Sequence, residues 1–380
     1  MRLAIFENIM TPGGHEVDFD RIIVEEFQKL GHEVSFLVPK GFKFAFDYKV
    51  PVKELEGDVV SYTGITGLKK LVASFRREWN RQKWYKQLYM EIMQKKVDAI
   101  IIPTSTYRYL RALAKNVLQR SPVPVIFILH GINPKEVKKF FKEAKKFTYN
   151  PNIKFVVLTF GQTIFGQKLS NMYTIYPPTF TPRDIDFQPK VEKKDVLKIG
   201  FFGQYRREKK LEDFLEVYIK GHYTRPVKLM VQGSTMHPED AEDFERIIAK
   251  YKDRDDMEFL HKGLIGPEWQ KAISEIDVLL LPYSANRYLY HWGGMLFTAI
   301  GFQKPVIASD DMNPEVFELH RIGELFKSGD LNDLKETLED FINDYDENVS
   351  EYAEELEEAS SEFSPDAFAK RVEKIIGWSK

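Results

Sequence analysis

A cluster of positively charged side chains follows an apolar, strand-like segment in the middle of the chain. Residues 197–202 read LKIGFF, and after Gly203 come Arg206, Arg207, Lys209 and Lys210. Cations at the carboxyl end of a buried strand can neutralise a diphosphate, and a site that excludes water strengthens each such contact. We therefore predict that this loop binds a phosphate-bearing substrate.

A second polar loop follows the apolar run 278–282. It combines aromatic, amide and cationic side chains with a glycine pair at the start of a helix-like segment. Backbone amides at a helix N-terminus attract anions, so this loop is a candidate for contacts to a nucleotide and a sugar. The predicted contacts are Tyr283, Asn286, Arg287, His291, Trp292, Gly293, Gly294 and Met295.

Candidate groups also occur in the first half of the chain. Gly13 and Gly14 separate a strand-like from a helix-like segment, where glycine lets backbone amides approach a bound group. His130 follows the apolar run 125–129. If the reaction requires a positioned base, Glu16, Asp18 and His130 are the candidates. The chain contains no Gly-x-Gly-x-x-Gly fingerprint and no Walker A loop, which argues against a dehydrogenase or an ATPase.

The elements that carry these loops alternate between strand-like and helix-like segments. Continuous apolar runs are typical of parallel strands that helices cover on both faces. The pattern breaks at the polar stretch 182–195 and then restarts, which predicts two doubly wound, Rossmann-like α/β domains facing across a cleft. The predicted strands are 2–7, 32–38, 98–102, 125–129, 154–159, 172–176, 197–202, 227–232, 257–260, 277–281, 305–309 and 323–326.

The predicted domains are residues 1–187 and 196–363, and an amphipathic helix at 364–380 is expected to pack back on the first domain. Ligands of such folds lie at the carboxyl ends of the strands. The chain has no cysteine, which excludes disulfides, a thiolate nucleophile and cysteine-ligated metals. Its apolar runs are far shorter than the ~20 residues that span a bilayer, and it begins without a signal peptide. We expect a cytoplasmic protein.

The net charge of −2 conceals a difference between the halves. Residues 1–190 hold 30 Lys and Arg against 18 Asp and Glu, whereas residues 191–380 hold 25 against 39. The positive excess is concentrated in 68–96, where Trp79 and Trp84 are interleaved, and in 135–147. Aromatic and basic residues together favour peripheral contact with an anionic membrane, on its inner face; solvated helices are the alternative. Nucleic acid is not expected as a partner, because the second half would repel it.

These segments resemble a GT-B glycosyltransferase, most closely the nucleotide-sugar-dependent family 4 (group 1) type. The resemblance covers nearly the whole chain, and its most specific part is 299–308, AIGFQKPVIA; the other segments are 12–16, 30–34, 130–131, 202–203, 208–209, 259–260 and 276–282. It implies hexosyl transfer with retention from a nucleotide-sugar to a glycan or lipid-linked acceptor, in cell-surface polysaccharide or glycoconjugate synthesis. A UDP-sugar is the favoured donor, with GDP- or dTDP-sugars as alternatives, and neither a metal ion nor a cofactor is implied.

The resemblance also implies roles for single residues. Lys209 matches the lysine that holds the donor diphosphate, and His130 matches the histidine of the acceptor domain near the donor sugar. Gln204 stands where an arginine is common, so Arg206 or Arg207 is expected to supply the second cation. The predicted catalytic residues are Glu16, His130, Arg206 and Lys209.

The sequence departs from the family at a pair of glutamates that seven residues separate. These positions fall on Tyr290 and Thr298, and Thr298 is the expected substitute contact to the donor ribose. The departure leaves two other hypotheses open. One is a non-catalytic GT-B partner subunit that binds a glycan or a sister enzyme, and the other is a sugar-nucleotide epimerase with the same fold.

Overall fold

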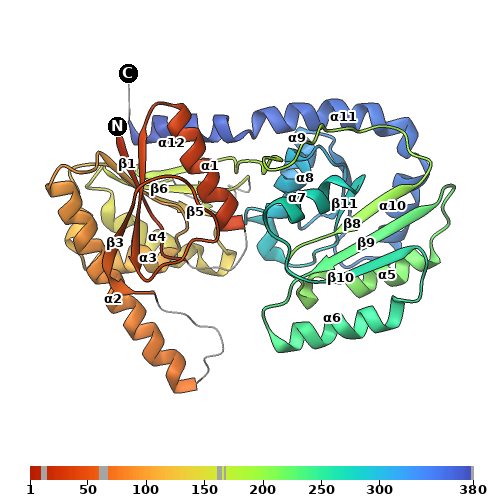
Figure 1. The fold of residues 1–380 in the computed structure, drawn as a ribbon, viewed down its shortest axis with the longest axis horizontal. Coiled ribbons are helices and arrows are strands. Elements are labelled where there is room, and N and C mark those ends of the chain that lie inside the picture. The colour runs from red at the N-terminus through yellow and green to blue at the C-terminus, as the bar shows by residue number, and fades with distance from the viewer. Residues whose placement is uncertain (10–14, 60–66, 161–164, 167, 378–380) are drawn as a thin grey trace. The chain divides into compact units, whose positions relative to one another are not determined.

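The computed structural model describes residues 1–9, 15–59, 67–160, 165–166 and 168–377 of the 380-residue chain. The chain divides into two compact units. Unit 1 comprises Met1–Tyr176 and Phe368–Lys380, and unit 2 comprises Pro177–Ala367. Each unit is built around one parallel β-sheet with helices packed against it (Figure 1).

Unit 1 contains a seven-stranded sheet in the order β3-β2-β1-β4-β5-β6-β7. Its strands are β1 (Arg2–Phe6), β2 (Glu33–Lys40), β3 (Val52–Asp58), β4 (Ala99–Ile102), β5 (Val125–Leu129), β6 (Ile153–Leu158) and β7 (Met172–Ile175). Its helices are α1 (His15–Lys29), α2 (Gly67–Met93), α3 (Tyr107–Leu113), α4 (Val137–Ala144) and most of α12 (Pro365–Ile376). Strands β4 and β5 are buried along their whole length, as their continuous apolar sequences require.

Unit 2 contains a six-stranded sheet in the order β10-β9-β8-β11-β12-β13. Its strands are β8 (Leu197–Phe201), β9 (Val227–Gly233), β10 (Met257–His261), β11 (Val278–Leu281), β12 (Val306–Ser309) and β13 (Gly323–Phe326). Its helices are α5 (Leu211–Lys220), α6 (Pro238–Tyr251), α7 (Gly266–Ser274), α8 (Gly294–Gly301), α9 (Pro314–Leu319), α10 (Leu331–Asn343) and α11 (Tyr345–Glu362).

The twelve predicted strands are confirmed to within a residue or two at their ends. Strand β3 was missed because it lies at the sheet edge and buries only Leu55, so its sequence VKELEGD is mostly polar. In both sheets the strand order reverses beside the first strand of the unit, between β1 and β4 and between β8 and β11. Ligands of open α/β sheets bind at this point, beyond the carboxyl ends of the strands.

The first unit ends earlier than the predicted boundary at 187, because the residues after Tyr176 pack on unit 2. Thr179 N donates to Phe363 O at 2.8 Å, and the Phe180 ring stacks on Trp292. Gly301 permits this approach, since a Cβ at that position would lie 2.2 Å from Phe180 O. The segment that reads as a linker in the sequence therefore belongs structurally to unit 2.

The last helix, α12, lies beside α1 in unit 1, where the blue ribbon meets the red one in Figure 1. Phe368 packs on Phe19 with ring centroids 5.5 Å apart. Glu373 pairs with His32 Nε2 at 2.8 Å. These contacts fix the end of the chain on the first domain fold.

Helix α2 has one face in the core of unit 1 and another in solvent. Trp84 is 1% exposed and donates through Nε1 to Gly57 O at 3.0 Å, and Arg81 lies over the Tyr109 ring at 4.2 Å. The expectation that Trp84 meets a membrane is therefore wrong, because its ring completes the core. Trp79 is 67% exposed. Among the helices of the described residues, none is both long and apolar enough to span a membrane.

Candidate active site

Hydrogen bonds join the loop after β8 to the neighbouring strand β9 and to the residue that follows it. Gly203 has φ of +103°, a conformation that favours glycine, and its amide donates to Gln232 Oε1 at 3.0 Å. Ser234 N donates to Gly203 O at 3.2 Å, and Tyr205 N donates to Ser234 O at 2.7 Å. Tyr205 also stacks on Phe244. The loop therefore holds the residues that follow it in a defined position above the sheet.

Lys209 is a cation buried at this position without a carboxylate partner among the described residues. It is 6% exposed; its Nζ donates to Tyr283 Oη at 2.9 Å and lies 4.3 Å from the centre of the Tyr283 ring. Burial, together with the charges of Arg206 and Arg287, lowers the pKa of Lys209 to about 7. A bound anion would restore the charged form, so Lys209 is suited to meet a phosphate.

Two arginines from different loops flank Lys209. Arg287, in the loop after β11, pairs with Glu208 and donates to Tyr288 Oη at 2.9 Å. Arg206 Nη1 lies 3.9 Å from the same Glu208 carboxylate. The structure thus gathers Arg206, Lys209 and Arg287 from two loops that the sequence separates by about eighty residues.

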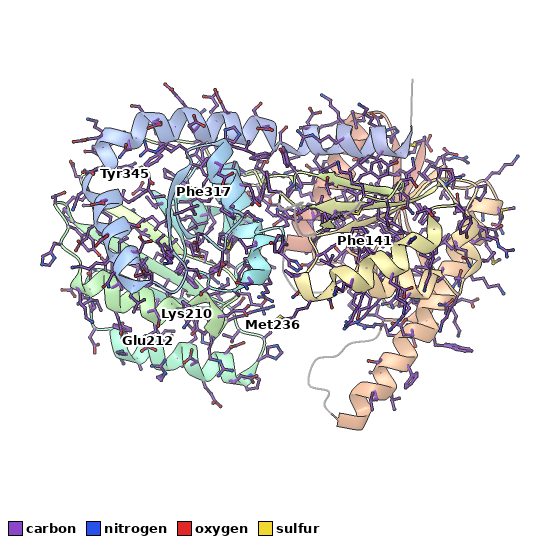
Figure 2. The ribbon with its side chains drawn as sticks, turned by 180° about the vertical axis from the view of Figure 1, so that it is seen from behind. Phe141, Lys210, Glu212, Met236, Phe317 and Tyr345 are labelled. Atoms are coloured by element: carbon purple, nitrogen blue, oxygen red, sulfur yellow. The ribbon has the colours of Figure 1, made fainter. Side chains whose placement is uncertain are left out.

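Two of the predicted cations are directed elsewhere. Arg207 is exposed and lies 3.5 Å from Asp240, and Lys210 pairs with Asp213 at 3.3 Å. Lys210 and the start of α5 are labelled in Figure 2. Arg207 is thus paired with Asp240, whereas Arg206 is the arginine of this loop whose charge acts on Lys209; which of them meets a diphosphate stays a prediction.

The glycine pair that precedes α8 packs against the loop after β12. A Cβ on Gly293 would lie 2.9 Å from Met312 Cε and 3.1 Å from Asn313 Oδ1. Asn313 is buried, and its Nδ2 donates to His291 O at 3.2 Å. A Cβ on Gly203 would lie 3.5 Å from Met295 Sδ and 3.7 Å from Lys209 Nζ. Met295 and the Lys209 amine therefore both lie close to Gly203, and the contact of these residues with a donor stays a prediction.

Three other predicted contacts differ in their surroundings. Trp292 is buried and its ring packs between Phe180 and Phe297, so this side chain is part of the hydrophobic core of unit 2. Thr298 is 4% exposed, and its hydroxyl donates to Gly294 O at 2.8 Å within α8. Asn286 is exposed at the start of a short 3₁₀ turn. The contact of Thr298 with a ribose stays a prediction.

In unit 1, buried carboxylates occupy the corresponding carboxyl end of β1. Glu7 accepts from Asn8 N and Ile9 N at 2.6 and 2.5 Å, while its Oε2 is buried with no partner in the described structure. Burial raises the pKa of Glu7 to about 8, with Glu16 adding to the shift. Asp20 is also buried, and burial together with Glu7 and Glu16 raises the pKa of its carboxyl well above the usual range.

His130 lies at the end of the neighbouring strand β5. Its Nε2 donates to Pro103 O at 3.0 Å, and its ring packs edge-on against Phe19 at 4.8 Å. Glu16 contributes to the raised pKa values of Glu7 and Asp20, so it belongs to the carboxylate cluster. The predicted residues Gly13 and Gly14 lie outside the described residues.

One group within the described part of the chain brings three possible metal ligands together. The ligand atoms of His320, Glu355 and Glu358 lie within 4.8 Å of one another. Both ring nitrogens of His320 already contact carboxylates, Glu355 at 3.3 Å and Glu362 at 2.9 Å. These contacts engage both ring nitrogens of His320, and none of the three residues belongs to the loops around Lys209.

Several residues of these clusters were not predicted from the sequence: Glu7, Asp20, Glu208, Tyr288 and Asn313. Glu7 follows a buried strand directly, which is a signal that could have identified it. Asn313 precedes a proline at a helix start and has φ of +45°. In the sequence, Glu208 looks like one member of a solvated run of charges. It belongs to the site because it pairs with Arg287, which lies far from it in the sequence.

We predict that Glu7→Gln reduces the loss of stability at alkaline pH. The pKa of Glu7 is about 8 in the folded protein and 4.5 in the unfolded chain. The folded state therefore favours the neutral carboxyl, and the stability that the neutral form contributes is fully present below pH 4.5 and is lost as the pH rises through about 8. Glutamine keeps an oxygen for the two backbone amides and carries no charge. At pH 9 the free energy of unfolding should rise by more than ~1.4 kcal/mol, the equivalent of one pKa unit, with little change at pH 5.

Denaturant unfolding at the two pH values measures this effect. Glu33→Gln, which removes the same charge from an exposed position on β2, is the matched control and should show no such pH dependence. Equal effects of both substitutions at pH 9 would contradict the assignment of a strained carboxylate to Glu7.

Comparison with known proteins identifies the family to which this chain belongs. The family described as "Glycosyl transferases group 1" matches residues 182–376, just over half of the chain. No curated protein matches the sequence significantly.

Solved structures are similar to the chain over almost their entire length. HepE of Anabaena, in complex with UDP and glucose, has a TM-score of 0.68 at 14% identity and covers 99% of both chains. Sucrose-phosphate synthase of Thermosynechococcus elongatus has a TM-score of 0.68 at 14% identity and covers 98% of both. WaaG, a glycosyltransferase involved in lipopolysaccharide biosynthesis, has a TM-score of 0.61 at 14% identity, covering 99% of this chain and all of that one. The two Rossmann-like sheets are those of the GT-B fold, and the chain belongs to the glycosyl transferases group 1 family.

Proposed function

We propose that this chain is an active glycosyltransferase that moves a hexosyl group from a nucleotide-sugar, most favourably a UDP-sugar, to a glycan or lipid-linked acceptor. The observation that carries the proposal is the buried Lys209 amine, which lies between Arg206 and Arg287 beyond the adjoining strands β8 and β11. A buried cation without an acidic partner is costly unless a bound anion completes it. The diphosphate of a nucleotide-sugar is such an anion.

The chemistry explains why cations are needed at this place. When the bond between the sugar C1 and the phosphate oxygen breaks, negative charge develops on the leaving diphosphate. Lys209, Arg206 and the backbone amides at the start of α8 stabilise that charge more in the transition state than in the bound donor, which lowers the barrier. Because these groups are all part of the protein, the proposal requires no metal ion.

UDP is the favoured nucleotide because HepE, with the same fold, is described in complex with UDP and with UDP-glucose. The proposal includes retention of the anomeric configuration, in which the leaving phosphate accepts the proton of the acceptor. Under this proposal Glu7, Glu16 and His130 of unit 1 bind or orient the acceptor. Acceptors of cell-surface polysaccharide synthesis fit the printed role of WaaG in lipopolysaccharide biosynthesis.

A non-catalytic partner subunit is the second candidate, and the surroundings of Thr298 favour it. The Thr298 hydroxyl donates within its own helix, and Tyr290 stands at the other glutamate position. A subunit that binds a donor without turning it over would keep the cation cluster. The two candidates differ in one readout, the release of free nucleoside diphosphate from a donor together with acceptor.

The proposal also places unit 1 at an anionic membrane, through residues 68–96 and 135–147. The exposed side chains Leu71, Val72, Phe75 and Trp79 recur on one side of α2 and are each more than half exposed. Figure 2 shows this part of α2 extending beyond the sheet with its side chains in solvent. An apolar stripe beside basic residues suits the bilayer interface, where aromatic rings and Lys or Arg each contribute.

The Lys209 site is tested first by a thermal-shift screen with UDP-, GDP- and dTDP-sugars, followed by Lys209→Ala. We expect loss of ~2–4 kcal/mol of transition-state stabilisation, which is about 30- to 1000-fold in turnover, because a charge-assisted contact to the diphosphate is removed. Calorimetric titration of the wild-type protein with UDP should show affinity that falls as the pH rises above 7, since Lys209 then loses its proton. Lys209→Ala should lack this decline.

Lys210→Ala is the matched control, because Lys210 is exposed and pairs with Asp213. It should leave UDP affinity and turnover unchanged. Turnover that survives in Lys209→Ala at the wild-type rate would refute the proposed role. UDP binding that depends on Lys209, without turnover for any acceptor tried, would instead identify a partner subunit.

Thr298→Val tests whether the threonine oxygen accepts from the donor ribose. The lost hydrogen bond is worth ~0.5–1.5 kcal/mol, so the donor KM should rise about 2- to 13-fold while the unfolding midpoint changes little. Thr298→Ser keeps the hydroxyl and should retain the wild-type KM. If valine leaves the KM unchanged, Thr298 acts only in helix packing.

Phe75→Ser combined with Trp79→Ser should weaken sedimentation with anionic vesicles. Removing two inserted apolar side chains should cost more than ~1.4 kcal/mol, or about tenfold in partition coefficient. Met236→Ser, which removes an exposed apolar side chain from unit 2 (Figure 2), is the control and should have no effect. Equal recovery of all three proteins in the supernatant, with and without anionic lipid, would show that α2 is a solvated helix.

A further inference from the structure

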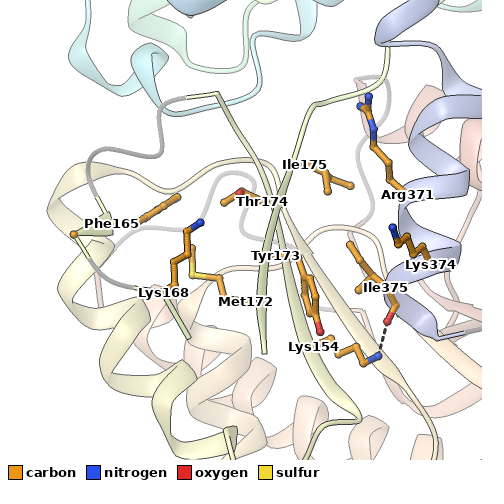
Figure 3. A pocket seen from close by; sticks show the side chains of 11 residues that line it. Lys154, Phe165, Lys168, Met172, Tyr173, Thr174, Ile175, Arg371, Lys374 and Ile375 are labelled. Atoms are coloured by element: carbon orange, nitrogen blue, oxygen red, sulfur yellow. Dashed lines mark hydrogen bonds between the residues drawn. The ribbon is translucent and has the colours of Figure 1, made fainter. Parts of the chain in front are cut away.

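Unit 1 carries a pocket between its edge strand β7 and helix α12 that none of the roles above uses. Its volume is about 980 Å³. Among the described residues, four side chains that line it are basic and no Asp or Glu does so. Figure 3 shows Lys168 on the side of Phe165 and Met172, and Arg371 and Lys374 on α12. The pocket therefore presents positive charge from three separate segments of the chain.

A second hollow of about 690 Å³ lies along α4 and shares Phe165 with the first. Its basic residues are Lys138, Lys142 and Lys145, and it too is lined by no Asp or Glu. The three lysines follow one face of the helix at spacings of four and three residues. The two hollows meet at Phe165, and we call them together the β7–α4 groove.

The lysines of this groove lack carboxylate partners within the described residues. None of Lys138, Lys142, Lys145, Lys154, Lys168 and Lys374 is ion-paired there. Neighbouring residues on the same helices are paired: Lys146 binds Glu143 at 2.6 Å, and Glu373 of α12 binds His32. Glu143 of α4 and Glu373 of α12 are thus engaged by residues that do not line the groove.

Lys154 lies on the floor of this region. Its Nζ donates to the carbonyl oxygen of Ile375, drawn as the dashed line in Figure 3, and lies 3.4 Å from Ile376 O. The carbonyls at the C-terminal end of α12 thus engage Lys154, so the charge of this lysine is held by the helix rather than by a carboxylate. Burial lowers the pKa of Lys154, as expected for a cation that is partly removed from water.

The groove also has an apolar component. Phe165, Met172, Ile175 and Ile375 line the first hollow, and Val137 and Phe141 line the second; Phe141 is labelled in Figure 2. Gathered like charges repel one another, and an anion that enters the groove would relieve this repulsion. A ligand that matches both components must join an anionic group to a hydrocarbon chain.

We propose that the β7–α4 groove binds a phosphate or diphosphate group carried on a hydrocarbon chain. Lys168, Lys374 and Arg371 contact the phosphate, and the apolar side chains around Phe165 hold the first part of the chain. This site is built from residues of unit 1, whereas the Lys209 cluster belongs to unit 2. The proposal goes beyond glycosyl transfer, because it concerns binding alone and holds whether or not the chain turns over a donor.

The test uses the full chain in a Lys209→Ala background, so that the other diphosphate site does not contribute. Calorimetric titrations compare farnesyl diphosphate, inorganic diphosphate and farnesol. We expect farnesyl diphosphate to bind at least ~10-fold more tightly than either of the others. Hydrogen exchange should show protection of residues 172–175 and 365–376 by farnesyl diphosphate.

The groove variant combines Lys168→Ser with Lys374→Ser, and its matched control combines Lys40→Ser with Lys115→Ser, two exposed lysines of the same unit that do not line the groove. The groove variant should lose at least ~10-fold in affinity for farnesyl diphosphate, and the control should lose less than ~2-fold. Circular dichroism melting of both variants checks that they fold.

Three outcomes would overturn the proposal. Equal losses in the two variants would show that only net charge matters. Inorganic diphosphate that binds as tightly as farnesyl diphosphate would show that the hydrocarbon chain is not recognised. Sedimentation with phosphatidylglycerol vesicles that depends on Lys168 and Lys374, without binding of soluble farnesyl diphosphate, would assign the groove to a bilayer surface. None of these results bears on turnover at Lys209.

Discussion

Burying the Lys209 amine is the constraint on which the organisation of unit 2 depends. An ammonium group removed from water destabilises a fold unless something compensates it, and the only direct polar partner of its Nζ within the described structure is the neutral Tyr283 hydroxyl. The adjacent Glu208 is engaged by Arg287 from the loop after β11. The loop itself is held by Gly203, Gln232 and Ser234. These backbone contacts hold the loop around the buried amine in place. Under the proposed function, a bound anion neutralises the charge of this amine.

The two units use the same topology with opposite charge. In each sheet the strand order reverses at one point, where the chain leaves the carboxyl end of the first strand. In unit 2 that point holds Arg206 and Lys209, whereas in unit 1 it holds Glu7 and Asp20, whose carboxyls have raised pKa values. Burial shifts the pKa of Lys209 downward and the pKa values of Glu7 and Asp20 upward, in each case toward the neutral form. One topology thus places a buried amine at this point in one unit and buried carboxyls in the other.

The departure from the family's glutamate pair is accompanied by a close packing of the donor loop. Asn313 donates to His291 O, and Met312 lies against Gly293, so the start of α8 is held by the loop after β12. Trp292 is anchored on Phe180, from the segment that joins the two units. The position of the α8 amides is therefore set by side chains rather than by charged contacts. This packing holds the start of α8 in place, although the glutamates of the family are absent from Tyr290 and Thr298.

The sequence alone determined the buried strands, because parallel strands covered on both faces must be apolar, and it located the loops that follow β8 and β11. It did not reveal the mostly polar edge strand β3. It could not show which charges of a run are used. Arg207 and Lys210 looked equivalent to Lys209, yet Asp240 and Asp213 pair with them, and Arg287 joins the cluster from about eighty residues away. Trp84 and Trp79 looked equivalent on one basic helix, yet Trp84 is in the core. Burial and pairing depend on which way a side chain points once distant elements pack, and only the tertiary structure decides that.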